Sequence, residues 1–200
     1  MRKLLCSLIC VMMLLLVAVP SLAAISGDEI KVYTTPILIT NAGQGPGGKM
    51  ARLLVSQAKT IVLDQDYFYN AEPQEADLDE REYSALVCVI GSTDKGLGAS
   101  GITIEDELAR LERMVNHAKE IELPIIAVLL EKDKRSSIPT NANERCIDVI
   151  CSSADWMIVV KDGNSDGRFD KLKEELNIPL TIIDNTLDFT ELAKQAFVLP

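Results

Sequence analysis

The sequence predicts an α/β fold: a three-layer αβα sandwich on a doubly wound, mostly parallel sheet of five or six strands in flavodoxin-like order. Two observations predict it. Short apolar runs alternate with helical patterns from residue 37 onward. The runs at 86–90, 125–130 and 156–160 are apolar at nearly every position, which is typical of parallel strands covered by helices on both faces. Because no repeat or linker divides the chain, we expect one domain.

The first half of this domain is expected to hold the strands that begin the sheet. In chain order we predict a strand at 37–40, a helix at 46–59, a second strand at either 61–63 or 67–69, an acidic loop or short helix at 70–82, and a central strand at 86–90. The helix places one apolar face against the sheet, formed by Met50, Leu53, Leu54 and Ala58.

The second half continues the alternation. Thr103 predicts the start of a helix, because acidic residues fill its first turn, and Pro124 ends it. The elements expected after it are a strand at 125–130, a helix at 141–154, a strand at 156–160, a helix at 166–176 and a strand at 180–183. Asp188 and Glu191 are expected to cap a closing helix.

The N-terminus has the pattern of a secretory signal. A basic pair at 2–3 precedes an apolar run over 4–19, and a small-x-small pattern ends at Ala23. We therefore predict a signal peptide over residues 1–23, cleaved near Ala23, and a single domain over 24–200 that is secreted or extracytoplasmic, in the periplasm or at the cell surface. The alternative is an uncleaved anchor, because the segment is long enough to span a bilayer; it would then provide the only membrane contact.

Charge excludes one class of partner. The chain carries 20 basic and 30 acidic residues, for a formal net charge of −10. Such a chain repels phosphate backbones unless its basic groups cluster, and Lys132, Lys134 and Arg135 are too few and alternate with Asp133. We therefore expect no nucleic-acid binding.

The residues that most often carry catalysis are scarce. Beyond the signal, the cysteines are Cys88, Cys146 and Cys151, which lie in apolar runs and predict small buried side chains rather than a disulfide framework. His117 is the only histidine of the chain, so the sequence offers no Ser-His-Asp or Cys-His arrangement and no histidine-rich metal site.

A first glycine-rich segment, 43–48, follows the first strand and opens a helix. It matches the G-x-G-x-x-G spacing of dinucleotide-binding folds, with Asp64 about twenty residues on. It also matches a Walker motif through Lys49, but Met50 replaces the hydroxyl that would hold Mg²⁺. An exported protein meets little nucleotide, so we do not expect these motifs to bind one. We expect the backbone geometry of the segment to matter instead. Backbone N–H groups at the start of a helix form a cradle for an anion.

A second glycine-rich segment, 91–101, leaves the central strand. In a flavodoxin-like sheet this segment and the first face each other across the topological switch point, where ligands bind. We therefore predict a crevice for a small polar or anionic ligand. The residues expected to line it are Thr40, Asn41, Gln44, Ser92, Thr93 and Lys95. The alternative is a surface loop packed on itself.

Both glycine-rich segments support a resemblance. The stretches 38–46 and 91–102 resemble a family of exported bacterial proteins classed as a domain of unknown function, with a flavodoxin/Rossmann-like α/β fold. The similarity covers about 35–197, and 95–99 is its most specific part. Family members carry a Gly/Arg-rich segment after the fourth strand, whereas this chain has a different sequence at 131–137. The resemblance implies the fold and export but no reaction.

The loop after the strand expected at 156–160 matches part of a calcium-binding pattern. Asp162, Asn164, Asp166 and Asp170 fall at positions that supply side-chain oxygens in a calcium loop, but position 12 is Lys173 instead of glutamate. Two interpretations stay open: a strand–loop–helix calcium site, and a turn that ends in a helix cap. The sequence indicates no cofactor other than this calcium.

These observations lead to three functional hypotheses. The first is a non-enzymatic extracytoplasmic binding module with its ligand at the switch point. The second is an extracytoplasmic enzyme that acts at the same crevice, with Asp94 and Lys95 as its acid–base candidates. The third is a cell-envelope interaction domain without a small ligand.

Overall fold

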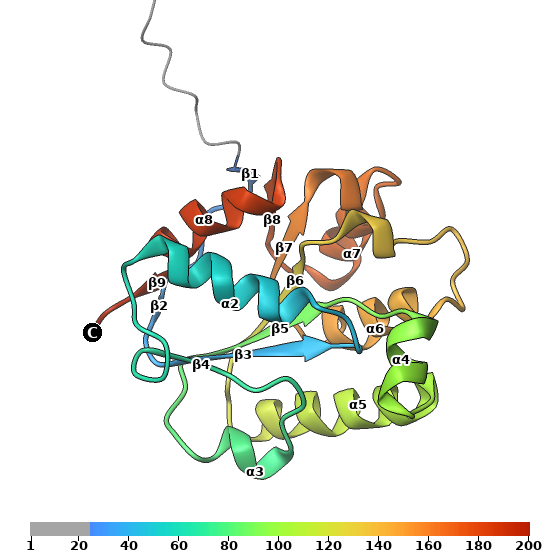
Figure 1. The fold of residues 1–200 in the computed structure, drawn as a ribbon. Coiled ribbons are helices and arrows are strands. Elements are labelled where there is room, and N and C mark those ends of the chain that lie inside the picture. Colours follow the sequence, from blue (N-terminus) through green and yellow to red (C-terminus); the bar gives the residue numbers. More distant parts are fainter. Residues whose placement is uncertain (1–24) are drawn as a thin grey trace, which may run out of the picture.

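A computed structural model describes residues 25–200 as a twisted sheet between two layers of helices (Figure 1). The signal peptide predicted over residues 1–23 lies outside the described residues. Within 25–200, no helix is both long and apolar enough to cross a membrane.

Over residues 25–200, the central sheet has seven strands, in the spatial order β1-β8-β7-β6-β5-β3-β4. The strands are β1 (Ile25–Gly27), β3 (Ile37–Ala42), β4 (Tyr67–Tyr69), β5 (Ala85–Ile90), β6 (Ile125–Leu129), β7 (Trp156–Val160) and β8 (Leu180–Ile183). All neighbours pair in parallel except β1, which runs antiparallel along β8. The parallel strands follow the predicted flavodoxin-like order, and the α/β sandwich is confirmed. A separate two-stranded sheet pairs β2 (Tyr33–Thr34) with β9 (Phe197–Val198).

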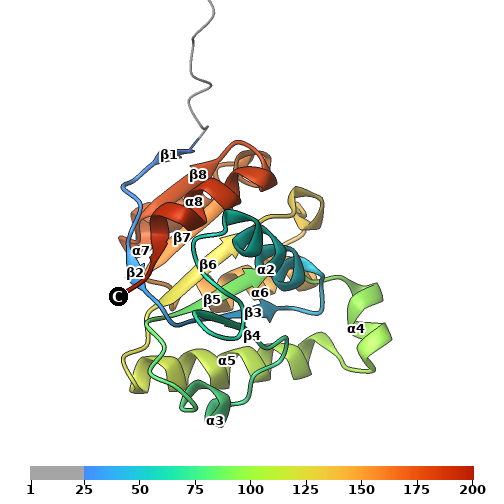
Figure 2. The same cartoon turned by 60° about the vertical axis from the view of Figure 1, so that its left-hand side comes forward.

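Helices cover both faces of the sheet, as the apolar strands require. The α-helices are α2 (Gly47–Ala58), α3 (Glu75–Leu78), α4 (Asp94–Ser100), α5 (Ile104–Glu120), α6 (Ala142–Cys151), α7 (Arg168–Leu176) and α8 (Phe189–Ala196). Helices α2 and α8 pack together on one face, and α5, α6 and α7 contribute to the core on the other (Figure 2). Short 3₁₀ turns follow β6, β7 and β8: η1 (Lys132–Lys134), η2 (Lys161–Asn164) and η3 (Thr186–Asp188).

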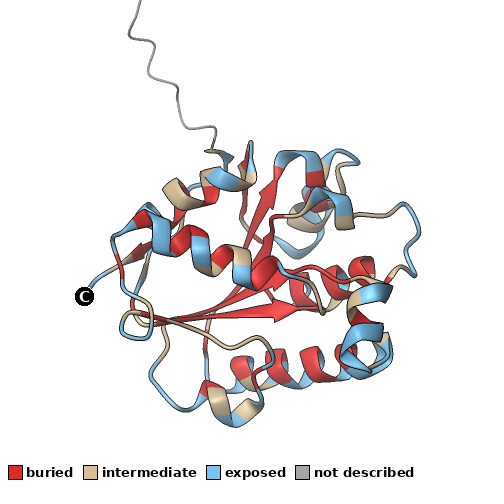
Figure 3. Cartoon of the chain, viewed as in Figure 1, coloured by how far each residue is buried: buried red, intermediate tan, exposed pale blue. Residues whose placement is uncertain are grey.

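Two apolar cores result from the alternation of side chains along the strands. In β5, Leu86, Cys88 and Ile90 point into the core below α5 and α6. The residues between them, Val87 and Val89, point into the core below α2 and α8. The whole strand is buried, as the interior of the sheet is in Figure 3. This explains why β5 is apolar at every position.

Helix α5 begins where the sequence predicts. The Thr103 hydroxyl accepts a hydrogen bond from the Asp106 N–H at 3.2 Å, and the Asp106 carboxylate accepts one from the Thr103 N–H at 2.9 Å. This reciprocal pair is a capping box, which satisfies two backbone N–H groups at the helix start. The Thr103 hydroxyl also donates to the Asp106 carboxylate at 2.6 Å, and this bond is the main cause that lowers the pKa of the Asp106 carboxyl.

Of the two positions left open for the second strand, the structure has the one at Tyr67–Tyr69. Two details differ from the sequence predictions. The segment 91–101 contains the short helix α4 instead of remaining a loop. The predicted cap of the closing helix is wrong, because the Asp188 carboxylate accepts from the Asn185 N–H at 2.8 Å and so caps η3. Strands β1, β2 and β9 have no counterpart among the predicted elements.

Candidate functional site

The two glycine-rich segments meet at the carboxyl ends of β3 and β5, but they pack directly on each other. A Cβ added to Gly43 or Gly45 would lie 2.6 or 2.4 Å from the Gly91 carbonyl oxygen. A Cβ added to Gly96 would lie 2.3 Å from the Gln44 carbonyl oxygen. Only glycine permits approaches this close, so these backbones leave no room for a ligand between them.

A buried ion pair lies beneath the first glycine-rich segment. Glu107 is fully buried, and its Oε1 is 2.6 Å from Nη2 of Arg110. The same oxygen accepts the Gly43 N–H at 2.8 Å, and Oε2 accepts the Gln44 amide at 3.1 Å. Arg110 also donates to the Asn41 carbonyl at 3.0 Å. A carboxylate of the chain itself therefore occupies the Gly43 N–H, part of the backbone cradle that the sequence assigned to an anionic ligand.

The polar residues predicted at β3 make internal hydrogen bonds. The Thr40 hydroxyl is buried and donates to the Ala71 carbonyl at 3.3 Å. The Asn41 side-chain oxygen accepts the Gly48 N–H of the first turn of α2 at 2.9 Å. Gln44 links Glu107 to the Ser100 hydroxyl, which donates to it at 3.0 Å. These contacts hold the segment in place around the ion pair.

The residues predicted at β5 separate into buried and exposed groups. The Ser92 N–H donates to Oδ1 of Asn143 at 3.1 Å, while the Ser92 hydroxyl and the Asn143 amide nitrogen are buried without a partner among residues 25–200. The Thr93 hydroxyl accepts the Gly96 N–H at 3.0 Å and so caps α4. Lys95 lies exposed on α4 and makes no ion pair with the described residues.

A cavity of about 350 Å³ opens two strands further along the same carboxyl edge. It lies where β6, β7 and β8 end and where α2 passes above them. Its polar lining consists of Glu131, Lys132, Asp133, Asp162, Asp184, Asn185 and Thr186. Two exposed ion pairs border it, Lys132 with Asp162 at 2.7 Å and Lys161 with Asp184 at 3.3 Å. None of the six predicted ligand residues contributes to this lining.

Glu131 is the residue in this cavity that the predicted site did not include. Its side chain is 18% exposed, and Oε1 is buried without a hydrogen-bond partner among residues 25–200. This oxygen lies 3.4 and 3.1 Å from the positions where Gly47 and Gly91 would carry a Cβ. Burial raises the pKa of the carboxyl, and Lys134, 3.7 Å from Oε2, opposes that rise only in part. Only one feature of the sequence could have pointed to Glu131. It directly follows the apolar run 125–130, at the carboxyl end of a predicted strand.

The predicted calcium residues lie in one loop but make separate contacts. Asp162 pairs with Lys132, and Asp166 pairs with Arg135 at 2.7 Å. The Asn164 amide donates to Asp170 at 2.9 Å, and its oxygen accepts the N–H of residue 169 at 2.8 Å, as a helix cap would. In the part of the chain that the structure describes, no three carboxylate, thiol or imidazole groups are arranged to hold a metal. Calcium binding stays a prediction.

Buried ion pairs hold the loops that follow β6 and β7. The Glu144 carboxylate is 1% exposed and lies 2.9 Å from Nε of Arg135. Arg168 contacts the same carboxylate and also reaches Asp148. Because Arg135 follows η1 and Arg168 begins α7, the pairs connect the two loops on one side of the cavity to α6.

The usual nucleophiles and bases lie away from this edge or are inert. His117 is in the last turn of α5 and lies 3.0 Å from the Asp79 carboxylate, which raises the pKa of the imidazole. Burial raises the thiol pKa of Cys88, Cys146 and Cys151 to about 12. A thiol with such a pKa holds almost no thiolate at neutral pH, so none of the three is an activated nucleophile.

Comparison with known proteins gives a family and a distant fold similarity. No curated protein matches the chain. The crystal structure of AlinE4, a SGNH-hydrolase family esterase, is 12% identical over 78% of this chain and 77% of that chain, with a TM-score of 0.31. A mutant of the same esterase gives the same identity and coverage with a TM-score of 0.29, and neither similarity identifies a shared activity. A family described as "Domain of unknown function (DUF6305)" matches residues 34–197, and this chain belongs to that family.

Proposed function

We propose that this protein is a non-enzymatic extracytoplasmic binding module whose ligand occupies the cavity at the carboxyl ends of β6, β7 and β8. The ligand is a small polar molecule that donates hydrogen bonds, such as an amine or a polyol. The observation that carries the proposal is the buried, unpartnered Oε1 of Glu131. A buried acceptor without a donor costs free energy, which a donating ligand recovers on binding.

The charge of the cavity supports a donor rather than an anion. Glu131, Asp133, Asp162 and Asp184 bring four carboxylates to the lining, against the single lysine Lys132. That lysine already pairs with Asp162 at 2.7 Å. Of the two ligand types that the sequence predicts, polar and anionic, the lining therefore favours the polar one. The size agrees, since ligand cavities begin at about 300 Å³.

The glycine-rich segments act in this proposal as supports. Gly47 and Gly91 leave the space in which the Glu131 carboxylate lies. Thr40, Asn41 and Gln44 fix the first segment through bonds to Ala71, Gly48 and Glu107, and Gly47 of that segment packs against the Glu131 carboxylate. The site stays on the edge where α/β proteins bind ligands, at the carboxyl ends of the strands.

The enzyme alternative has less support. Its candidates, Asp94 and Lys95, are exposed neighbours on α4 and do not line the cavity. A general acid or base acts on a group within hydrogen-bond reach, next to a bound substrate. Glu131 has the raised pKa of an acid–base residue, but no activated nucleophile stands beside it among residues 25–200.

Thermal melting in the presence of chosen ligands tests the proposal. Protein is purified in the form that cells accumulate and melted with ethanolamine, glucose or inorganic phosphate. We expect ethanolamine or glucose at ten times its dissociation constant to stabilise the fold by about 1.4 kcal/mol. This corresponds to roughly 3–5 °C for a domain of this size. Phosphate should give no shift.

Paired variants identify the cavity as the site. Glu131→Gln removes the charge but keeps the size of the side chain and one acceptor oxygen, and we expect it to reduce the shift with ethanolamine, which loses its counter-charge, more than the shift with glucose. Glu191→Gln is the control, because Glu191 lies on α8 and, among residues 25–200, forms an ion pair only with Lys194, at 2.9 Å. If neither ethanolamine nor glucose shifts the melting temperature, whatever phosphate does, or if both variants respond as the wild type does, the proposed function is wrong and the interaction-domain hypothesis gains.

A further inference from the structure

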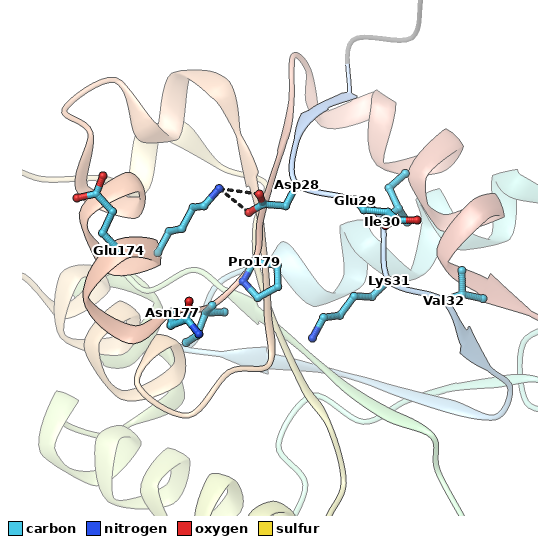
Figure 4. A pocket seen from close by; sticks show the side chains of 10 residues that line it. Asp28, Glu29, Ile30, Lys31, Val32, Glu174, Asn177 and Pro179 are labelled. Carbon is cyan, nitrogen blue, oxygen red and sulfur yellow. Dashed lines mark hydrogen bonds and ion pairs between the residues drawn. The ribbon is translucent and has the colours of Figure 1, made fainter.

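A second, larger cavity of about 930 Å³ lies at the opposite, amino edge of the sheet. One wall is the segment 28–32, which joins β1 to β2, and the other is the end of α7 with the residues that lead into β8 (Figure 4). We call it the amino-edge groove. It is separate from the proposed ligand site, because Pro179 of the groove precedes β8 whereas Asp184 of the ligand site follows its end.

The groove carries uncommitted negative charge. Three carboxylates and two lysines line it: Lys173 lies 2.6 Å from the Asp28 carboxylate, and Lys31, which keeps its charge, donates to the Asp155 carbonyl at 2.7 Å. Its other two carboxylates, Glu29 and Glu174, make no ion pair with any described residue. Helix α7 also ends at the groove, where the carbonyl end of the helix dipole attracts positive charge.

Backbone groups on one wall are free to pair. Asp28 is the last residue of this segment that bonds to β8, through its N–H to the Leu180 carbonyl at 2.9 Å. From Glu29 to Val32, no backbone N–H or carbonyl bonds to another described residue. Such a row of free donors and acceptors is a template for an added strand.

Apolar side chains accompany the free backbone. Ile30, Ile178 and Pro179 line the groove, and Val32 is 62% exposed at its end. This exposure is high for an apolar side chain, and a bound peptide would cover it. The groove thus combines apolar contact, backbone pairing and negative charge in one place.

We propose that the amino-edge groove binds an extended peptide in which basic and apolar residues alternate. The peptide pairs with the backbone of 29–32, a stretch of four residues that spans about 13 Å in a strand. Its basic side chains meet Glu29 and Glu174, and its apolar side chains cover Ile30 and Val32. The site is independent of the carboxyl-edge cavity, so either can exist without the other.

Fluorescence anisotropy with a labelled peptide of alternating lysine and valine tests the proposal. We expect Glu174→Lys to weaken binding about threefold, as the loss of one exposed ion pair does, and the double variant Glu29→Lys with Glu174→Lys to weaken it about tenfold. Glu175→Lys is the matched control: it makes the same charge change one position along α7, at a residue outside the groove. It should change the affinity less than twofold.

Two further measurements distinguish binding in the amino-edge groove from general charge attraction and from binding in the carboxyl-edge cavity. A peptide of alternating glutamate and valine should bind at least tenfold more weakly than the lysine peptide, and Glu131→Gln should leave lysine-peptide binding unchanged. The proposal is overturned if the wild type does not bind the lysine peptide, if Glu174→Lys and Glu175→Lys weaken it equally, or if the acidic peptide binds as well. Loss of binding in Glu131→Gln would instead assign the peptide to the carboxyl edge.

Discussion

Two carboxylates at the carboxyl edge, the fully buried Glu107 and the 18%-exposed Glu131, differ in what surrounds them. Glu107 accepts hydrogen bonds from Gly43, Gln44 and Arg110, so both of its oxygens are satisfied. Glu131 has one oxygen without a donor and a raised pKa. A fully satisfied carboxylate stabilises the fold, whereas a partly satisfied one leaves an acceptor for something else. The comparison separates a structural polar cluster from a candidate ligand site within one edge of the sheet.

The largest expected effect comes from breaking the satisfied pair. Glu107→Gln leaves the Arg110 guanidinium buried without its counter-charge, and removing one member of a buried pair costs about 3–5 kcal/mol. We therefore expect a loss of about 3 kcal/mol in the free energy of unfolding, measured by urea titration. Glu131→Gln provides the contrast, because it removes a charge that burial disfavours, and it should leave the stability within about 1 kcal/mol of the wild type. Equal losses in the two variants would contradict the distinction.

A second prediction concerns the contact that closes the switch point. Gly43 has φ +107°, and an added Cβ would lie 2.6 Å from the Gly91 carbonyl oxygen. Gly43→Ala should therefore destabilise the fold by about 2 kcal/mol or more, since both backbone strain and overlap oppose it. Gly98→Ala is the control, because it lies in α4 with open space around it and should be neutral or stabilise by up to about 1 kcal/mol. Differential scanning calorimetry of both variants measures the difference.

The sequence predicted the fold more fully than the site, for physical reasons. The central strands can be recognised in the sequence because burial on both faces requires apolar residues at every position, as in Leu86–Ile90. Strands β1, β2 and β9 are two or three residues long and partly exposed, so no such pattern marks them. The glycine-rich segments were predicted to meet, and they do. Their spacing does not reveal that they pack without a gap.

The two carboxylates were missed for different reasons. Glu107 and Arg110 precede Leu111 and Met114 by one helical turn each, so they lie on the buried stripe of α5, where a charged pair could have been suspected. Glu131 belongs to no motif, and its environment depends on Gly47 and Gly91, which are distant in sequence. Only the packing of α2 and β5 around it reveals that its carboxylate is buried.

The pH dependence of stability sharpens the comparison further. Burial raises the pKa of Glu131 above its usual value of 4.5, so the folded state binds its proton more tightly than the unfolded chain does. The resulting stability is present below pH 4.5 and is lost as pH rises through the folded pKa. We expect the wild type minus Glu131→Gln difference in unfolding free energy to decrease over that window. Asp28, Asp162 and Asp166, whose pKa values are lowered, act below pH 3.8 instead. A difference that does not vary above about pH 4 would show that Glu131 titrates normally.

The smallest expected effect concerns calcium at the loop 162–170. Binding would require Asp162 and Asp166 to leave Lys132 and Arg135. The first pair is exposed and worth about 0–1 kcal/mol, whereas the second involves an Arg135 side chain that is only 10% exposed. At a calcium concentration three times the dissociation constant, the gain would be about 0.8 kcal/mol. Magnesium should do less, because it sheds its water reluctantly. Melting curves in calcium, magnesium and chelator measure these shifts.

Two variants decide whether any calcium shift arises in this loop. Asp166→Ala should abolish it by removing a ligand. Lys132→Met should increase it, because Asp162 would lose the ammonium that lies 2.7 Å away and lowers the pKa of its carboxyl. If Lys132 competes with the metal, Lys132→Met should thus increase the calcium shift. If Lys132 does not compete, the shift should stay unchanged. If the wild-type curves superimpose in all three solutions and Lys132→Met does not separate them, the loop is a turn and helix cap, held by the Asn164 contacts.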